Sequence, residues 1–479
     1  MTPELEANVK LSVTTILARF IATARETELP EEAICAARRH LLDGVGVMIG
    51  GSAESSARVS QGYVSEYESS QSCTVLGTDI LAAAPLAALA NGTAAHALEF
   101  EDGHDMAGLH PSVCVIPAAF AAAERANATL GELLTAIVVG YEVACRLTRC
   151  CRSRRNWALE PSWHFTTLCG IFGAVGAAAV IDKLSADDVE QSLGLATSFA
   201  AGHLLAEQDG TGSKFLQAGW GAQAGVSAVD LVKRGMSAPR GALDRPAGFL
   251  PLYVRDFTLE SLVDDLGTRY EIIGASIKPY PTCRFTHGVI DAVLSLRSQS
   301  EINRSDISRI DIGLPKLSYA RVVDPVESRR RPQNIIAARF SAPYVAALAW
   351  LRGAVSLDDF LVHFPDTEVL TLAERVFCHV DESLPDTLYA AEVVVRGSDS
   401  EFRRLVSHPL GSPEHPLSHS ALLTKFCMCA SRGLGLGKDD VKIHGLAEII
   451  RSADKAFPVR ALTARATRSR ANEPYQNDA

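Results

Sequence analysis

The sequence predicts a mainly α-helical protein built from a large all-α domain and a smaller α+β domain. The chain has 479 residues, which is more than one ordinary hydrophobic core accommodates. Aromatic residues make up only 6% of the chain while alanine and glycine are abundant, a composition that suits closely packed helices. After about residue 270 the spacing of apolar residues changes from helical to alternating, which indicates strands.

The first part is expected to open with two amphipathic helices within residues 5–50. Val13, Leu17 and Ile21 recur at helical spacing in the first helix. Pro30 begins the second helix, and the two glutamates that follow it stabilise the positive end of the helix dipole.

Ala-rich helical segments continue through residues 80–205, broken by Gly, Asn and Pro. The clearest of them are Leu81–Ala95, Pro117–Ala126 and Leu130–Arg146. Leu168–Ile181 is the longest strongly apolar stretch, and it is shorter than the ~20 residues of a membrane span. It therefore predicts a buried helix, and no membrane association is expected.

Three glycines in this buried segment, Gly170, Gly173 and Gly176, could suggest a dinucleotide-binding loop. Their spacing differs from that fingerprint and no convincing strand precedes them. We interpret them as small residues that let two helices pack closely.

The smaller domain shows strand patterns. Ile310 and Ile312 alternate in one expected strand, and residues 388–397 and 401–406 are typical of a hairpin. Helices are expected between these strands, so the segment is α+β. After it, from Ser418, the chain returns to helical spacing.

Domain boundaries follow from these patterns. Within the smaller domain the helices are expected at 285–297 and 340–352. The expected divisions are 1–270 for the all-α domain, 271–405 for the α+β domain, 406–460 for helices that rejoin the first domain, and 461–479 for a disordered tail.

Charge and cysteine usage restrict the possible functions. The net charge of −10 disfavours nucleic-acid binding, although a few cations converging in one cleft could still bind an anionic metabolite. The 11 cysteines lack the paired spacing of zinc or iron–sulfur ligands, so no such metal site is expected. Their odd number and the absence of a signal segment favour a reduced, cytoplasmic protein.

Acids and imidazoles gather in residues 96–118. Glu99, Glu101 and Asp102 lie within four residues of one another, and His104 and His110 follow. Such groups before a helix are placed for proton transfer or ligand orientation. The alternative is a solvated acidic loop, and the spacing of the two histidines matches no common metal pattern.

Two more segments place single functional groups at helix starts. His164 precedes the buried apolar helix, where the dipole lowers its pKa and favours a neutral base; it could instead be a packed residue. Lys214 lies in the first turn of the helix after 210–213, which is unfavourable unless an anion sits beside it. The alternative for Lys214 is a surface lysine.

A fourth segment, residues 276–293, carries Lys278, Arg284 and His287 between prolines at the expected domain boundary. Together they could clamp an anion, or they could form a basic linker. Cys283 lies among them, but nothing nearby supports a nucleophilic role.

These segments, in this order, resemble the MmgE/PrpD family. The similar motifs are P-E-E-x-x-x-x-A-R-R-x-L-L-D-G-V-G (30–46), N-G-T-A-A-H-A-L-E-F-E-D (91–102) with L-H-P-S (109–112), W-H-x-T (163–166), S-K-x-L-x-x-G-W-x-A-x-A-G (213–225), I-K-P-Y-P-T-C-R-F-T-H (277–287), F-S-A-P-Y-V-A-A-L-A (340–349) and P-L-G-S-P-E-H-P-L-S (409–418). The likeness extends to about residue 455. It implies a helical domain with an α+β lid, a homodimer, and an active site between the domains.

The resemblance implies a cofactor-independent lyase that acts on a small polycarboxylate by removing a proton, or CO2, next to a carboxylate. A hydro-lyase similar to 2-methylcitrate dehydratase is expected first. The alternatives are an epimerase similar to iminodisuccinate epimerase, a carboxy-lyase similar to cis-aconitate decarboxylase, and an inactive metabolite-binding relative. The decarboxylase is placed lower because Gly103 departs from the family pattern and only Tyr319 could replace a tyrosine of some decarboxylases.

The resemblance also implies roles for site residues. The positions that match the family's catalytic site are Asp102, His110, His164, Lys214 and Lys278, and the expected substrate-binding residues are His104, Arg284 and His287. The two lysines would stabilise negative charge that develops on carboxylate oxygens. His164 is the expected base, His110 the expected acid, and Asp102 would orient a histidine.

Overall fold

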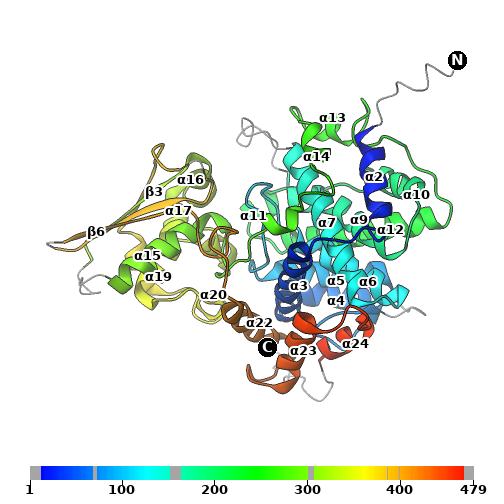
Figure 1. Ribbon diagram of the computed structural model, residues 1–479. Helices are drawn as coiled ribbons and strands as arrows, with labels where there is room; N and C mark the ends of the chain where they lie inside the picture. Colours follow the sequence, from blue (N-terminus) through cyan, green and yellow to red (C-terminus); the bar gives the residue numbers. More distant parts are fainter. Residues whose placement is uncertain are drawn as a thin grey trace.

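The structure is a computed structural model that describes residues 12–67, 73–151, 163–299, 307–385, 387–398 and 400–468. Two separate hydrophobic cores divide these residues. The first core takes its residues up to Ile277 and again from Leu410 onward, and the second takes them from Tyr280 to Val406. The chain therefore leaves the first core once and returns to it, as Figure 1 shows.

The large domain is helical. Its main helices are α2 (Val13–Thr23), α3 (Glu31–Gly51), α4 (Ser55–Ser65), α5 (Ala84–Ala97), α6 (Ser112–Ala126), α7 (Leu130–Cys151), α9 (Gly170–Ile181), α10 (Ala186–Ala196), α12 (Ser213–Lys233), α22 (His419–Leu434) and α23 (Val441–Ser452). Shorter elements are α8 (Phe165–Leu168), α11 (Leu205–Gln208), α13 (Phe249–Tyr253), α14 (Glu260–Val263), α24 (Val459–Thr463) and strands β1 (Cys73–Thr74) and β2 (Leu81–Ala82). Among the described residues, no helix combines the length and hydrophobicity that crossing a bilayer requires.

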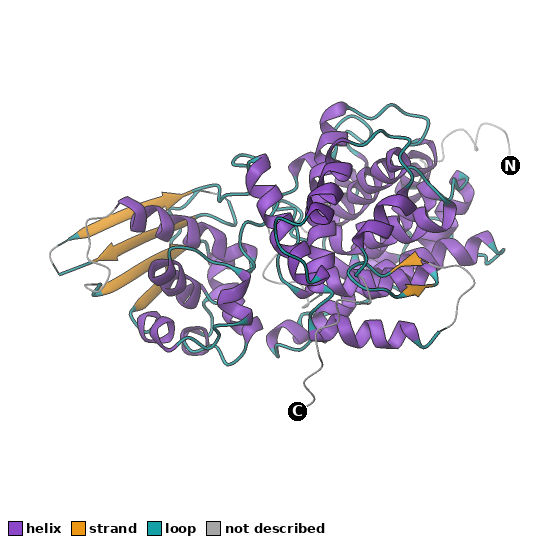
Figure 2. Ribbon diagram, turned by 90° about the horizontal axis from the view of Figure 1, so that it is seen from below, coloured by secondary structure: helices purple, strands orange, loops and turns teal. Residues whose placement is uncertain are grey.

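The smaller domain packs helices against a four-stranded sheet, which Figure 2 shows at one end of the molecule. The strands are β3 (Arg309–Leu314), β4 (Val376–Val380), β5 (Ala391–Arg396) and β6 (Glu401–Val406), in the order β4-β3-β5-β6. Strand β3 pairs parallel with β4 and antiparallel with β5. The helices are α15 (His287–Gln299), α16 (Lys316–Val322), α17 (Val326–Arg330), α18 (Ile335–Arg339), α19 (Ala342–Arg352), α20 (Leu357–Leu361) and α21 (Thr367–Ala373).

The predicted mainly α fold with a smaller α+β part is confirmed. Strand β4 was missed because it is an edge strand with one fully buried residue, Val376, and so lacks alternation. The helix expected from Leu81 begins at Ala84 because Pro85, which has no N–H to donate, favours the first turn. Helix α6 begins at Ser112 and passes through Pro117, whose apolar packing outweighs one lost hydrogen bond.

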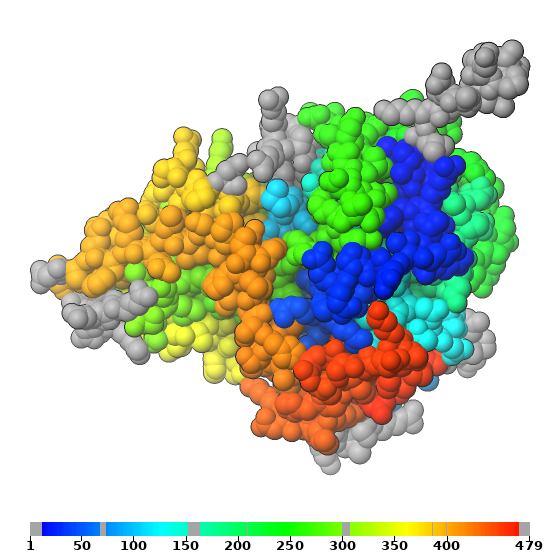
Figure 3. Space-filling view, viewed as in Figure 1, coloured from blue at the N-terminus to red at the C-terminus, as the bar shows by residue number. Residues whose placement is uncertain are grey.

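The C-terminal segment differs from the expected tail in its first residues. Helix α24 and a 3-10 turn over Ala464–Ala466 are ordered because Leu462 is buried in the first core. In addition, the Thr463 hydroxyl donates to Glu124 at 2.6 Å. Residues 469–479 of that expectation lie outside the described residues. On the face in Figure 3, the C-terminal helices (orange to red) lie directly below the blue N-terminal segment, and α22 and α23 pack against α3.

Small residues set the close helix crossings of the large domain. A Cβ added to Gly173 of α9 would lie 2.6 Å from the Gly140 carbonyl oxygen of α7, which confirms close helix packing at this glycine. Helix α12 crosses α5 in the same way at Gly219, where an added Cβ would lie 2.3 Å from the Leu89 carbonyl oxygen. Tight crossings of this kind fix the positions of the helix ends.

Replacing Gly219 by alanine should lower the free energy of unfolding by about 1–3 kcal/mol, because the helices must separate to admit the methyl group. Gly445→Ala is the matched control. Gly445 lies within α23, and an added Cβ there would meet no atom within 4 Å, so alanine should stabilise by about 0.5–1 kcal/mol. Thermal unfolding followed by circular dichroism measures both; equal midpoints for the two variants would contradict the close crossing.

Candidate active site

A cavity of about 210 Å³ lies between the two domains. It is lined on one side by Glu99, Gly103, His104, Asp105, Gly108, Leu109, His110, Trp163, His164, Phe165, Thr166, Leu204, Glu207 and Lys214, and on the other by Cys283, Arg284, Phe285, Leu317, Arg321, Phe340 and Tyr389. The size is below that of typical drug-sized ligand pockets, which are about 300–1,000 Å³. The cavity therefore suits a small metabolite.

Two buried glutamates bring the two expected lysines together. The turn after α5 holds Glu99 at a φ of 53°, which costs a non-glycine residue about 1–3 kcal/mol. Glu99 pairs with the Lys214 ammonium, and Glu101 accepts from the Lys278 ammonium at 2.9 Å. Lys278 also donates to the Glu99 carbonyl oxygen at 3.0 Å. Residues from three distant segments thus form one charged cluster.

Lys214 is placed by the start of α12, where the sequence predicted an adjacent anion. The structure supplies two protein carboxylates, Glu99 and, at 3.7 Å, Glu207. Burial alone would lower the pKa of Lys214, but Glu99 and then Glu207 outweigh it and raise that pKa. Lys214 therefore faces the cavity as an ammonium ion.

His164 lines the cavity in a defined tautomer. Its Nδ1 lies 3.0 Å from Gln217 Oε1. The Gln217 amide is oriented by His203, because Nε2 donates to the His203 carbonyl oxygen and Oε1 accepts from the His203 N–H. An amide oxygen can only accept, so His164 Nδ1 carries the proton and Nε2 is left for a ligand.

Burial lowers the pKa of His164 well below its ordinary value, and the neighbouring His96 and Lys214 lower it further. The His164 imidazole is therefore neutral, and the causes are burial and the neighbouring groups rather than the helix dipole on which the sequence prediction rested. Its position at the N-cap of α8 agrees with the expected helix start, although α8 is only four residues long.

His110 is the second imidazole on the cavity wall. Its Nδ1 lies 2.5 Å from the Asp102 carbonyl oxygen, which fixes that nitrogen as the donor. Nε2 forms no hydrogen bond with the described residues. Burial, and next the charge of Lys278, lower the pKa of His110 to about 4. The side chain keeps 23% exposure, so it can exchange protons with solvent.

Asp102 lies behind this wall rather than on it. Its carboxylate is 3.0 Å from His40 Nδ1, and it accepts from the Tyr141 hydroxyl at 2.5 Å and from the Ser112 N–H at 3.2 Å. Burial alone would raise the pKa of Asp102, but hydrogen bonds, first from His40, outweigh it and lower that pKa. The carboxylate anchors the acidic turn to α3 and α7, and only the Asp102 carbonyl reaches a cavity histidine.

Three further residues were missed in the sequence. His40 follows Arg38 and Arg39 in α3, and Tyr141 precedes Glu142 in α7, so neither stands out from its polar neighbours in the sequence. His96, within a family motif, is fully buried 3.3 Å from Glu101. The ring centroid of His96 is 5.7 Å from that of His110 and 5.5 Å from that of His164, so the three imidazoles form one cluster.

The remaining predicted residues do not all face the cavity. Lys278 is fully buried behind the lining, and His287 lies behind Arg284, 3.2 Å from its guanidinium. Arg284 lines the cavity but its expected carboxylate clamp holds Asp105, at 2.9 and 3.1 Å. His104 also lines the cavity, and its Nε2 lies 3.1 Å from Glu271.

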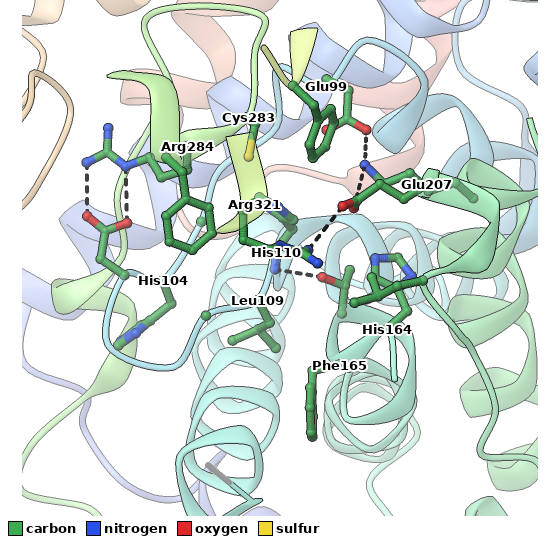
Figure 4. A pocket seen from close by; sticks show the side chains of 18 of the residues that line it. Glu99, His104, Leu109, His110, His164, Phe165, Glu207, Cys283, Arg284 and Arg321 are labelled. Atoms are coloured by element: carbon green, nitrogen blue, oxygen red, sulfur yellow. Dashed lines mark hydrogen bonds and ion pairs between the residues drawn. The ribbon is translucent and has the colours of Figure 1, made fainter. Parts of the chain in front are cut away.

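Figure 4 shows that these residues lie in two groups. His110, His164, Glu207 and Arg321 gather on one side, whereas His104 lies apart from them, on the same side of the view as Arg284. Arg321 and Glu207 were not predicted. Arg321 lies in α16 and Glu207 in the short helix α11, and charged side chains in such helices are common on protein surfaces, so neither residue stood out in the sequence.

A metal site could be considered where His96, Glu99 and Glu101 bring ligand atoms within 4.8 Å of one another. The ammonium groups of Lys214 and Lys278 already neutralise these carboxylates. A divalent cation would have to displace two buried lysines, so this donor set does not fit a metal.

The fold and the cavity define a two-domain, mainly helical protein with a small, polar cavity between its domains. The chain belongs to the MmgE/PrpD family. The MmgE/PrpD N-terminal domain matches residues 15–262, and the MmgE/PrpD C-terminal domain matches residues 280–446. The family expected from the sequence motifs is thereby confirmed.

Curated relatives match nearly the whole chain. A cis-aconitate decarboxylase of Aspergillus terreus is 28% identical over 95% of this chain and 96% of its own length. A cis-aconitate decarboxylase-like protein of Aspergillus oryzae is 26% identical over 95% and 97%. The human cis-aconitate decarboxylase is 27% identical over 94% of both chains. These matches indicate a lyase of this family.

Proposed function

We propose that this protein is a cofactor-independent carboxy-lyase that releases CO2 from a small unsaturated tricarboxylate of the cis-aconitate type. One observation carries the proposal. A buried ammonium, Lys214, and two imidazoles, His110 and His164, face a single small cavity between the domains. The named activity of the relatives, at near full length, supports the same reaction class.

The proposed reaction consumes one proton and one tricarboxylate trianion, and it yields CO2 and a dicarboxylate dianion. CO2 leaves from the saturated carbon, the electron pair of the broken C–C bond forms a new double bond to the central carbon, and the electron pair of the old double bond shifts to the far carbon. Negative charge then develops at the far carbon, next to a carboxylate. Catalysis requires that this charge be stabilised, and the Lys214 ammonium in its buried setting can do so.

One of the two imidazoles supplies the proton. The surroundings described above favour the neutral form of both, but a bound trianion favours their protonated forms. His110 is the proposed donor to carbon, because it is the more exposed of the two and is recharged from solvent. His164, protonated at Nε2 in the complex, is the proposed second cation next to the developing charge. Lys278 and Asp102 are proposed positioning residues.

Part of the cavity lining suits the product CO2. Leu109, Phe165, Leu204 and Leu317 present apolar surface. An apolar surface destabilises a carboxylate more than neutral CO2, which favours its loss. A hydro-lyase is the second candidate, because two imidazoles on one cavity could also serve as base and acid.

Purified protein should be incubated separately with cis-aconitate, citrate, 2-methylcitrate and iminodisuccinate. The proposal predicts CO2 release from cis-aconitate and one deuterium in the product when the solvent is D2O. If citrate or 2-methylcitrate instead gave a new ultraviolet absorbance from a C=C bond, the protein would be a hydro-lyase and not a carboxy-lyase. Deuterium exchange into iminodisuccinate without net conversion would indicate an epimerase. No turnover with any compound would favour a non-catalytic metabolite-binding protein.

Gln217 gives a test of how His164 acts. Its hydrogen bond raises the pKa of His164, so Gln217→Glu should raise that pKa further and Gln217→Leu should lower it. If His164 acts protonated, activity is lost as the pH rises through its pKa, so the basic limb of the kcat profile moves up in Gln217→Glu and down in Gln217→Leu. A shift of the acid limb instead would identify His164 as a base, and unmoved limbs would contradict the pairing.

A further inference from the structure

The charges that line the cavity cancel. The cations are Lys214, Arg284 and Arg321, and the carboxylates are Glu99, Asp105 and Glu207. A polycarboxylate therefore meets no net positive charge from these six side chains. Its binding becomes more favourable when one of the three protein carboxylates moves away and leaves a cation free.

The three carboxylates are held to different degrees. Glu99 is buried and hydrogen-bonded to Lys214. Asp105 accepts two hydrogen bonds from Arg284 and one from Ser276. The Glu207 side chain, in contrast, forms ion pairs but no hydrogen bond with the described residues. Glu207 is the carboxylate that can move at least cost.

Glu207 bridges two cations from different domains. Its Oε1 lies 3.1 Å from Arg321 Nη2, on α16 of the smaller domain, and its Oε2 lies 3.7 Å from Lys214 Nζ, on α12 of the larger. This is the only ion pair of Arg321 among the described residues, and the Arg321 side chain keeps 31% exposure. A guanidinium and an ammonium arranged around one carboxylate are well suited to bind another.

We propose that Lys214 and Arg321 form a carboxylate subsite in which the Glu207 carboxylate stands in for a carboxylate of the ligand. One carboxylate of the polycarboxylate substrate takes the place of the Glu207 carboxylate and bridges the two domains. The inference rests on the proposed function for the class of ligand, and it adds Arg321 as a binding residue and Glu207 as an internal competitor.

Binding of tricarballylate tests the subsite without turnover. This saturated tricarboxylate lacks the double bond that the proposed decarboxylation requires. Calorimetric titration should give a dissociation constant about 10- to 100-fold higher for Arg321→Met, which loses a charge-assisted hydrogen bond. Glu207→Gln should bind at least about threefold more tightly, because a competing occupant is removed.

Two exposed residues provide matched controls. Arg403→Met on β6 and Glu448→Gln on α23 should bind as the wild type does. Unchanged binding by both Arg321→Met and Glu207→Gln, or no binding by the wild type at millimolar tricarballylate, would overturn the subsite. The predicted changes together with no turnover of cis-aconitate would support the subsite and reject only the carboxy-lyase.

Discussion

Replacement of Lys214 by methionine should lower kcat/KM for cis-aconitate by about 10²–10³-fold, the loss seen when one preorganised donor to a developing anion is removed. Lys214 is a buried cation that lines the same cavity as both imidazoles. Its charge acts where water is excluded, so its electrostatic effect is larger than at a surface. Steady-state kinetics of the purified variant measure the effect.

The same substitution leaves the buried Glu99 without its main partner, which by itself destabilises the fold. Combining Lys214→Met with Glu99→Gln removes both charges and separates folding from catalysis, because the double variant should refold but remain slow. Lys233→Met, at the exposed end of the same helix, is the control and should retain wild-type activity. A double variant with wild-type kcat/KM would remove Lys214 from the mechanism.

His164→Gln should lower kcat by about 10²–10⁴-fold while the fold is preserved. The glutamine side chain fills similar space but cannot be protonated, so it provides neither a cation nor a proton-transfer group. Because His164 lies in the cavity and its tautomer is fixed through Gln217, its loss should appear in kcat at saturating substrate.

His203→Gln is the matched control for this variant. The His203 side chain is exposed, and the contacts of His203 with Gln217 use only its main chain. Equal melting temperatures for wild type and both variants would show that neither change affects the fold. Turnover by His164→Gln close to the wild-type rate would mean that this imidazole only packs.

Much of the fold followed from local patterns. Pro30 with two glutamates predicted the start of α3, and the alternation around Ile310 and Ile312 predicted β3. Strand β4 could not be predicted in the same way, because its place is set by parallel pairing with a strand more than 60 residues earlier in the chain.

For the site, the order of the motifs predicted which charged side chains belong to it, but not which carboxylates those side chains pair with. Lys214 and Lys278 meet through Glu99 and Glu101, which lie in the segment that the sequence marked as unusually acidic. Whether a cation faces a ligand or a protein carboxylate depends on tertiary packing. Arg284 therefore could not be distinguished from a free carboxylate clamp until Asp105 was placed beside it.

The site residues that could not be predicted owe their proposed roles to contacts with segments that are distant in the sequence. Gln217 matters because His203 orients its amide, and Arg321 because α16 carries it to the cavity from the other domain. Neither residue type is unusual at its position in the chain. Single-sequence patterns carry no information about such contacts between distant segments.

A crystal structure of the His164→Gln protein soaked with cis-aconitate is the most direct test, because the slow variant should retain unreacted substrate. We expect density for the tricarboxylate between the domains, one carboxylate against Lys214, and the carbon that is protonated within about 3–3.5 Å of His110 Nε2. Substrate bound only on the outer surface, with none between His110 and Lys214, would contradict the assignment of this cavity as the site of reaction.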